Sequence, residues 1–354
     1  MKDIGEIVKN LKFFFNDIRN IHEIPVGNIN RTFVVTLSRK CSDLRDHKPF
    51  PRKFVAQLIN SKVFTIKAVE RNLTAFSSLV NTNQSLNEII PKYLVYDKKV
   101  VSCDNKGNAW KFTEFIEKAR CGQFPKSETE SYLAARSLAI FHRELSKINI
   151  RSFRYSIPNF FVPQIRVKQF FNALKRGNSR RVANVSRHLD QIFCIKEKLE
   201  KPIIMMTKQQ KFLCHNDTKF ENFLIVEKKA YIIDHDVLQP GVIAYDIGDF
   251  LRTVCFLENE DKQSEPDIKV DFLRSASEGL NVLSYERCFG VDRELIKLSP
   301  AILSFILALR FLTDYLLGDR YFKIKYEDQN LKRGVCQLRR SEILYENRDQ
   351  IRIR

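Results

Sequence analysis

FLCHNDTKFENFLIVEKKAYIIDHDVLQPGVIAYDIGDFLR, residues 212–252, places acids, an amide and a histidine around short apolar runs. Residues 223–226 and 230–233 are two four-residue strand candidates, and residues 227–229 between them suit a three-residue hairpin loop. A register that is symmetric about Lys228 sets Asn222 opposite Asp234. The stretch therefore predicts a hairpin that brings an amide and a carboxylate together at its open end.

This pairing predicts a magnesium site. Opposed residues of a hairpin have Cβ atoms about 4.5–5.5 Å apart, so the oxygens of Asn222 and Asp234 converge on one point. Mg²⁺ takes one or two such protein oxygens and completes its octahedron with water and substrate phosphates. Asp217 precedes Asn222 by five residues and is placed to act on a hydroxyl beside the metal. The grouping fits phosphoryl transfer, with Asp217 as the catalytic carboxylate and Asn222 and Asp234 as metal ligands.

Three segments in order carry a resemblance to a known family: HNDTKFENFL (215–224), IDHDVLQPG (233–241) and YDIGDFLR (245–252). Any one of them alone is more often ordinary turn chemistry. Together they resemble aminoglycoside phosphotransferases and choline kinases, and within that superfamily they are most similar to the N-acetylhexosamine 1-kinase branch. The C-terminal segment ALRFLTDYLLGDRYFKIKYEDQNLKRGVCQL (308–338) is similar to the same branch.

The resemblance implies an α+β, two-lobed, protein-kinase-like fold. A small antiparallel-sheet N-lobe, residues 1–117, would bind the nucleotide, and a larger, mostly helical C-lobe, residues 118–354, would carry the catalytic and sugar-binding residues. ATP and Mg²⁺ are the implied cofactors. The single cut after residue 117 follows WKFTEFI (110–116), which resembles the last N-lobe strand of the branch.

The same resemblance places nucleotide contacts in the N-lobe. Gly27, Asn28, Asn30 and Thr32 would form the flap over the nucleotide phosphates. The hinge is expected at residues 112–117, with Phe112 and Phe115 beside the adenine.

One departure from the family concerns the cation that holds the nucleotide phosphates. Kinase-like folds carry it on a strand of the small sheet and orient it with an acid from the next helix. Leu58 stands where the branch has a basic residue, and Glu70 and Arg71 are both candidates for the helix position. Arg71, Lys53 or Lys62 are the alternative sources of charge.

In the C-lobe, the resemblance brings Asp236, Phe160, Arg310 and Tyr321 to the sugar. Two of them have a structural alternative: Asp236 as a supporting residue, and Arg310 in a salt bridge with Asp314, four residues along the same helix face. Helical spacing of Ala134, Leu138, Phe141 and Leu145 predicts a buried helix face, with His142 at the surface or in a cap.

Four further residues near the motif are given supporting roles. His215 is expected to brace the catalytic loop by hydrogen bonding. Asp246 and Asp249 are expected to stabilise the loop and the following helix, with Arg252 paired to one of them.

Composition sets the remaining bounds. The net charge of +18, from 60 basic and 42 acidic residues, attracts anions in general. No nucleic-acid motif accompanies the basic run 166–187, so we expect a solvated helical face there, with a separate polyanion contact as the alternative. Eight scattered cysteines indicate neither a zinc site nor disulfides. The apolar helix expected at 302–317 is too short and too charged to span a bilayer, and a cytoplasmic location is expected.

The predicted reaction is transfer of the ATP γ-phosphoryl group to the anomeric hydroxyl of an N-acetylhexosamine or related sugar, which yields a sugar 1-phosphate. Two alternatives stay open. The acceptor could be another small alcohol, as in choline or aminoglycoside kinases, or the chain could be a non-catalytic, pseudokinase-like binding protein. The sequence does not indicate an oligomeric state.

Overall fold

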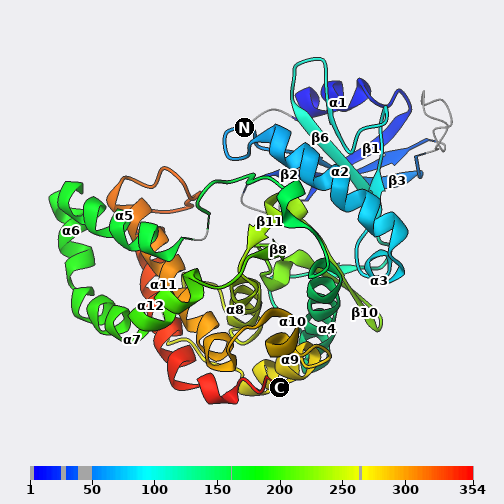
Figure 1. Ribbon diagram of the computed structural model, residues 1–354. Helices are drawn as coiled ribbons and strands as arrows, with labels where there is room; N and C mark the ends of the chain where they lie inside the picture. Colours follow the sequence, from blue (N-terminus) through cyan, green and yellow to red (C-terminus); the bar gives the residue numbers. More distant parts are fainter. Residues whose placement is uncertain (1–3, 25–28, 39–49, 161, 263–264, 354) are drawn as a thin grey trace. The chain divides into compact units, whose positions relative to one another are not determined.

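The computed structural model describes residues 4–24, 29–38, 50–160, 162–262 and 265–353 (Figure 1). Gly27, Asn28 and Phe161 lie outside the described residues. The chain forms two compact units. Unit 1 comprises residues 1–119, 149–158 and 233–239, and unit 2 comprises residues 120–148, 159–232 and 240–354. Unit 1 thus takes in two segments that lie beyond the single cut expected after residue 117.

Unit 1 is built on one antiparallel sheet with strand order β1-β2-β3-β6-β4, in which β5 also pairs with β6. The amphipathic pattern of residues 1 to about 22 predicts one helix, but the helix ends at Lys12 and strand β1 follows within the same stretch. The elements are α1 (Ile4–Lys12), β1 (Ile18–Ile24), β2 (Arg31–Leu37), β3 (Lys53–Leu58), α2 (Ile66–Thr82), α3 (Gln84–Asn87), β4 (Tyr93–Leu94), β5 (Val101–Cys103), β6 (Ala109–Glu114), η1 (Ile150–Ser152) and η3 (His235–Val237).

The two faces of this sheet differ in chemistry. One face packs on α1 through a buried aromatic cluster, in which the rings of Phe15 and Phe54 lie 4.8 Å apart and those of Phe15 and Phe112 lie 5.3 Å apart. Successive strand residues point to opposite faces. Thr32, Gln57 and Lys111, which are register partners on β2, β3 and β6, therefore lie together on the other face. We call these three residues the polar row.

Unit 2 is mainly helical and carries one three-stranded antiparallel sheet, β10-β9-β7. Its elements are β7 (Arg120–Cys121), α4 (Glu128–Leu145), α5 (Pro163–Arg176), α6 (Ser179–Ser186), α7 (Leu189–Thr207), β8 (Phe212–Cys214), η2 (Phe220–Asn222), β9 (Phe223–Val226), β10 (Lys229–Ile232), α8 (Ile243–Val254), α9 (Val270–Leu280), α10 (Tyr285–Phe289), α11 (Arg293–Leu316), α12 (Gln329–Glu346) and η4 (Arg348–Gln350). Strand β11 (Gln239–Gly241) crosses from unit 1 into unit 2. A small antiparallel sheet with a larger helical part is the predicted fold class, which is confirmed.

Helix α11 is the core helix of unit 2. It packs mainly against α12, α8 and α5. It is longer than the predicted 302–317 helix and is, by length and composition, the one described helix that could cross a membrane. The sequence expectation that it is too short is therefore wrong. Of its most apolar 18-residue window, 78% is buried inside the protein, as expected for a helix whose apolar surface is covered by neighbouring helices.

The predicted hairpin is present, with a different register. Val226 pairs with Lys229 and Phe223 with Ile232, so the turn has two residues, and Glu227 takes a left-handed φ of 49°. The symmetric register about Lys228 is wrong by one residue. The left-handed backbone of Glu227 closes a tighter turn than the three-residue loop expected from the sequence.

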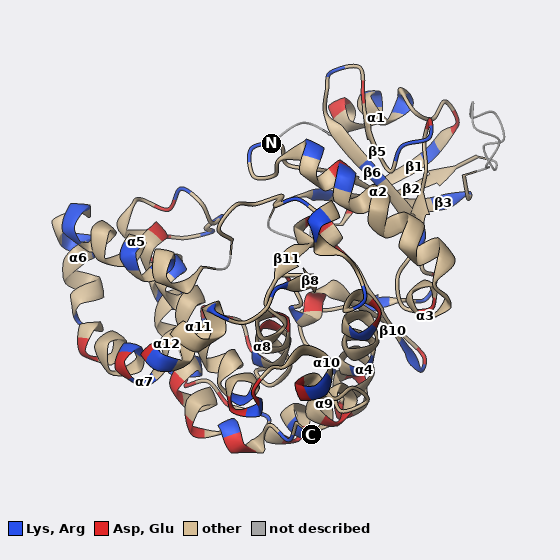
Figure 2. Ribbon diagram, viewed as in Figure 1, with Lys and Arg blue, Asp and Glu red and all other residues tan. Residues whose placement is uncertain are grey.

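The basic run 166–187 forms α5 and α6, as expected (Figure 2). Lys168, Lys175, Arg176 and Arg180 are exposed, but two other members of the run turn inward. Arg166 donates to the carbonyl of Phe160 over 3.0 Å, and Arg181 pairs with Asp319 over 2.6 Å. The run is therefore partly structural rather than a uniform basic surface.

Candidate active site

The predicted catalytic loop of unit 2 connects β8 to β9. The amide nitrogen of Asn222 donates to Asp217 twice, to the backbone carbonyl over 2.7 Å and to the carboxylate Oδ2 over 2.9 Å. These bonds turn the amide nitrogen toward Asp217 and leave Oδ1 of Asn222 as the atom suited to a cation. The residues present therefore fit the oxygen ligation that Mg²⁺ prefers.

Asp246, in the first turn of α8, anchors the backbone of this loop. Its carboxylate accepts from the backbone N–H groups of His215 over 2.8 Å and Asn216 over 2.7 Å. Its backbone carbonyl accepts from the Thr218 hydroxyl over 2.5 Å. The predicted role of Asp246 in stabilising the catalytic loop is confirmed.

Two histidines complete this support. His215 is buried, and its Nδ1 lies 3.2 Å from the backbone nitrogen of Asp217, which matches the predicted bracing role. His142 is also fully buried, with Nε2 3.1 Å from Asp246 and Nδ1 3.2 Å from the Tyr285 hydroxyl. The expected surface or capping position of His142 is wrong, because α8 and α10 supply its hydrogen-bond partners Asp246 and Tyr285.

Lys219 lies beside Asp217 and helps to lower the pKa of its carboxyl group. The side chain of Asp217 is 26% exposed, and Lys219 Nζ lies 3.5 Å from its Oδ2. Burial raises the pKa of Asp217, but Lys219, His215 and the bond from Asn222 together outweigh it and leave the pKa below its ordinary value. Asp217 is thus a carboxylate at neutral pH, ready to accept or orient a proton.

Arg252 supports the same region. It pairs with Asp249 over 2.6 Å, as predicted. Burial raises the pKa of Asp249, although Arg252 opposes it.

In unit 1, the segment after Ile233 carries the predicted metal ligand Asp234, which takes a left-handed conformation with φ 66° and ψ 56°. Lys111 Nζ lies 3.6 Å from Asp234 Oδ1 and contacts Asp236 Oδ1 directly. Asn30 donates to the other carboxylate oxygen of Asp236. Asp236, whose side chain is 1% exposed, is thus engaged through both oxygens within unit 1. Its contact with a sugar stays a prediction.

Buried polar side chains fix this segment to the rest of unit 1. Asn72 on α2 donates to the carbonyls of Arg154 over 2.7 Å and Leu238 over 2.9 Å, and it accepts from the N–H of Arg154. The Ser156 hydroxyl donates to the carbonyl of Asp236 over 2.8 Å. Tyr93 and His235 share a hydrogen bond of 2.9 Å. The position of Asp234 is thus set by partners far away in the sequence.

The predicted nucleotide contacts are placed differently from one another. Asn30 lies against Asp236, and Thr32 accepts a hydrogen bond of 3.1 Å from Gln57. Phe112 is buried in the aromatic core. It lies within β6, which pairs with both β3 and β4, and not in a hinge that follows the sheet. Phe115 follows the end of β6, and Lys53 Nζ lies 3.8 Å from its ring centroid. Nucleotide contact by Asn30, Thr32 and Phe115 stays a prediction.

The expected sugar contacts of unit 2 gather around Arg310. Its guanidinium carbon lies 5.5 Å from the ring centroid of Phe160 and 5.7 Å from that of Tyr321. Phe322 adds a third ring at 5.4 Å. We call this group, together with Arg166, the arginine–aromatic cluster. Asp314 instead accepts from the N–H groups of residues 320, 321 and 322, so the alternative Arg310–Asp314 salt bridge is wrong.

Arg166 completes the cluster. Burial and then the nearby charge of Arg310 lower its pKa. Among the described residues, no carboxylate forms an ion pair with Arg166 or Arg310. The cluster therefore presents positive charge and ring faces without an acidic group.

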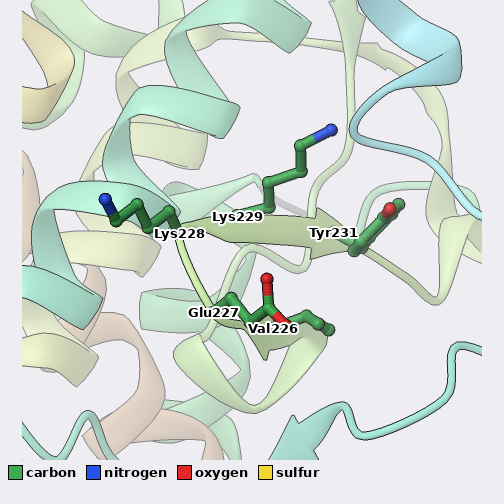
Figure 3. A pocket seen from close by; sticks show the side chains of 5 residues that line it. All are labelled: Val226, Glu227, Lys228, Lys229 and Tyr231. Carbon is green, nitrogen blue, oxygen red and sulfur yellow. The ribbon is translucent and has the colours of Figure 1, made fainter.

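A shallow pocket at the hairpin turn is remote from this chemistry. Residues 226–229 and Tyr231 line it, with Lys228 and Lys229 directed apart (Figure 3). Asn222 stands just before the first residue of β9, whereas the pocket lies at the last residue of that strand and at the turn after it. The four residues of β9 separate the two places by about 13 Å at the usual rise per strand residue.

Sequence reasoning assigned no role to Lys111, Lys219 or Arg166. Lys219 was recoverable, since it stands inside the catalytic motif between Asp217 and Asn222. Lys111 is a charged residue among the apolar residues at the start of β6, which signals a buried partner, but no local pattern identifies that partner. Arg166 stood within a basic run that was expected to face solvent.

No family model matches the chain. Solved structures do. Spectinomycin phosphotransferase in complex with ADP and spectinomycin matches over 98% of both chains, with a TM-score of 0.61 and 14% sequence identity. The fold is kinase-like.

Two further matches agree. Amicoumacin kinase in complex with AMP-PNP and Ca²⁺ covers 96% of this chain and 94% of its own, with a TM-score of 0.58 and 12% identity. Choline kinase from Streptococcus pneumoniae covers 96% and 99%, with a TM-score of 0.57 and 13% identity. The expected kinase-like fold is thereby confirmed.

Proposed function

We propose that the protein is a small-molecule kinase that transfers the γ-phosphoryl group of ATP to the anomeric hydroxyl of an N-acetylhexosamine or a related sugar. The observation that carries the proposal is the geometry of the catalytic loop. Asp217 is a carboxylate of lowered pKa held by Asn222, and Asp246 anchors the backbone of that loop. Solved proteins of the same fold include kinases bound to ADP or to AMP-PNP with Ca²⁺.

Each residue has a defined part in this reaction. Asp217 orients the acceptor hydroxyl and takes its proton, while Asn222 and Asp234 would hold Mg²⁺. The metal neutralises charge on the transferred phosphoryl group when it is bound. An anomeric hydroxyl is more acidic than an ordinary alcohol, so a carboxylate of low pKa suffices as its base. Positioning and charge stabilisation supply the rest of the rate enhancement.

The arginine–aromatic cluster favours a neutral or anionic acceptor over a cationic one. Choline and aminoglycosides carry positive charge, which two arginines without a paired carboxylate would repel. A sugar offers hydroxyls that accept from Arg310 and a ring face that packs on Tyr321 or Phe160. This observation supports the sugar kinase over the choline-like and aminoglycoside-like alternatives.

The deciding experiment measures ATP consumption by the full chain with Mg²⁺ and a panel of free hexosamines, hexoses, choline and an aminoglycoside. We expect turnover with a hexosamine, and release of the product phosphate under mild acid, to which sugar 1-phosphates are labile. Turnover only with choline or the aminoglycoside would overturn the sugar assignment. Failure to bind or hydrolyse ATP with every acceptor would favour the non-catalytic binding protein that Leu58 suggested.

A matched pair of variants tests the acceptor site. Arg310→Met should raise the KM for the sugar, because it removes hydrogen-bond donors and the charge over the rings. Arg180→Met, on exposed α6, should leave it unchanged. Equal effects of the two variants on KM would contradict the assignment of the cluster.

A further inference from the structure

The strand that was expected to carry the phosphate-binding cation cannot supply it from position 58. Leu58 packs against the aromatic core, on the face of the sheet opposite the polar row. Gln57 occupies the polar face of β3 and donates to Thr32. A basic residue at position 58 would point into the core, so the cation has to come from another strand.

Lys111 supplies a cation on the polar face. It is the register partner of Gln57 on the neighbouring strand β6, so the two side chains start about 4.5–5.5 Å apart on one face. Its side chain is 2% exposed, and its ammonium group lies between Asp236 and Asp234. A buried lysine is retained only with such partners, because an unpaired buried charge is costly.

The other basic residues considered from the sequence lie away from Asp234 or are bound to other groups. Arg71 on α2 donates to the carbonyl of Ser152 over 2.8 Å. Lys53 lies at the start of β3, where it covers the Phe115 ring and pairs with Glu117. Lys62 is exposed in the loop after β3. Among these lysines and arginines, Lys111 alone lies beside the proposed metal ligand Asp234.

We propose that Lys111 is the cation that holds the nucleotide phosphates, supplied by β6 instead of β3, and that Asp236 orients it in place of an acid from helix α2. The proposal rests on the proposed kinase function. Its three ammonium hydrogens allow Lys111 to keep Asp236 and donate to a phosphate oxygen at the same time. Asn30 fixes the second oxygen of Asp236, which keeps the carboxylate turned toward Lys111.

A structural role makes a different prediction. If Lys111 only neutralises Asp236, then removing both charges restores the nucleotide site. If Lys111 contacts phosphate, the charge-balanced double variant folds but still binds ATP weakly. Lys111→Met alone cannot separate these cases, because it leaves Asp236 buried without its cation.

The test compares wild type, K111M/D236N and K106M by calorimetric binding of Mg-ATP and of adenosine, with thermal unfolding as the check on folding. Lys106 is half-exposed in the same unit and pairs with Glu6, so K106M is the matched lysine-to-methionine control. We expect K111M/D236N to bind ATP about 10- to 100-fold more weakly, the loss expected for one charged hydrogen bond. Adenosine affinity should be unchanged, because adenosine carries no phosphate.

A second variant moves the cation back to β3. K111M/D236N/Q57K places a lysine directly opposite the vacated position, and we expect it to regain at least part of the ATP affinity. ATP binding by K111M/D236N equal to wild type would overturn the role of Lys111 while the kinase proposal stands. Absence of ATP binding by the wild type would overturn the kinase proposal itself.

Discussion

Asn72 in unit 1 and Asp246 in unit 2 both anchor the backbone of another segment, but they differ in reach, meaning the separation along the sequence between the anchor and the residues that it binds. Each is at most 1% exposed and ties backbone groups of a functional segment to a helix. Asp246 accepts hydrogen bonds from three residues of the neighbouring loop, which precede it by 28 to 31 positions. Asn72 holds Arg154 and Leu238, which are 82 and 166 positions away.

The difference in reach separates two ways of building a site. The catalytic loop and its anchor lie within one continuous stretch, 215–252, so a single motif describes both. The segment 233–239 is held by residues from α2, β4, β6 and the 149–158 segment. Loss of Asp246 should therefore disturb only the neighbouring loop. Loss of Asn72 should weaken contacts among four separate parts of the chain.

The largest effect is expected where chemistry is removed without disturbing either anchor. Asp217→Asn keeps an oxygen that accepts from Asn222 but cannot take a proton. We expect kcat to fall by about 10²- to 10⁴-fold, the usual contribution of a general base, with an unchanged unfolding midpoint. Steady-state kinetics with saturating ATP and sugar measure it. A kcat within a fewfold of wild type would remove Asp217 from its assigned role.

Loss of the short-reach anchor should cost the most stability. Asp246→Ala leaves the N–H groups of His215 and Asn216 buried without an acceptor, and we expect about 3 kcal/mol or more off the free energy of unfolding. Urea denaturation measures it. Asp271→Ala, which removes an exposed acid on α9, is the control and should stay within about 0.5 kcal/mol. A similar small change for both variants would refute the anchoring role.

Loss of the long-reach anchor, Asn72, should lower the stability less than loss of Asp246, and its effect should extend over two separate segments. Asn72→Ala removes three hydrogen bonds of a neutral side chain, and we expect a loss of about 2 kcal/mol. Hydrogen exchange should rise in 150–158 and in 233–239, although these segments are far apart in sequence. The KM for ATP should rise more than that for the acceptor. Unchanged exchange in either segment would show that Asn72 does not link them.

The smallest effect concerns the charge beside Asp217. Burial raises the pKa of Asp217, but Lys219 and its neighbours bring it below the ordinary value. Activity that needs the carboxylate is therefore present at neutral pH and lost only as the pH falls through this lowered pKa. In Lys219→Met the acid limb of the kcat/KM profile should move to higher pH. An acid limb that stays in place would mean that Lys219 does not set this pKa.

The same contrast explains what the sequence could predict. Short-range patterns predicted the hairpin strands, the α4 core face, the bracing role of His215 and the pairing of Arg252 with one of the two nearby acids, Asp246 or Asp249. They misplaced the hairpin register because a single left-handed residue, Glu227, shortens the turn. They also placed His142 at the surface, since its partners Tyr285 and Asp246 come from elements more than 100 residues away.

Lys111 shows the limit most clearly. Its charge in an apolar strand was visible, yet its partner Asp236 stands 125 positions along the chain. The alternation of β3 puts Leu58 and Gln57 on opposite faces of the sheet. Which of the two faces the core follows from the registers of three strands, which only the folded sheet provides.

The return of residues 233–239 to unit 1 also orders events during synthesis. Residues 1–119 leave the ribosome with Lys111 already in place on its strand and its acidic partners not yet made. At 5–20 residues per second, the 125 residues between Lys111 and Asp236 take on the order of ten seconds to add. For that interval Lys111 lacks both of its acidic partners, Asp234 and Asp236. The ion pairs of unit 1 can therefore form only after residues 233–239 have been added, later than the predicted catalytic loop.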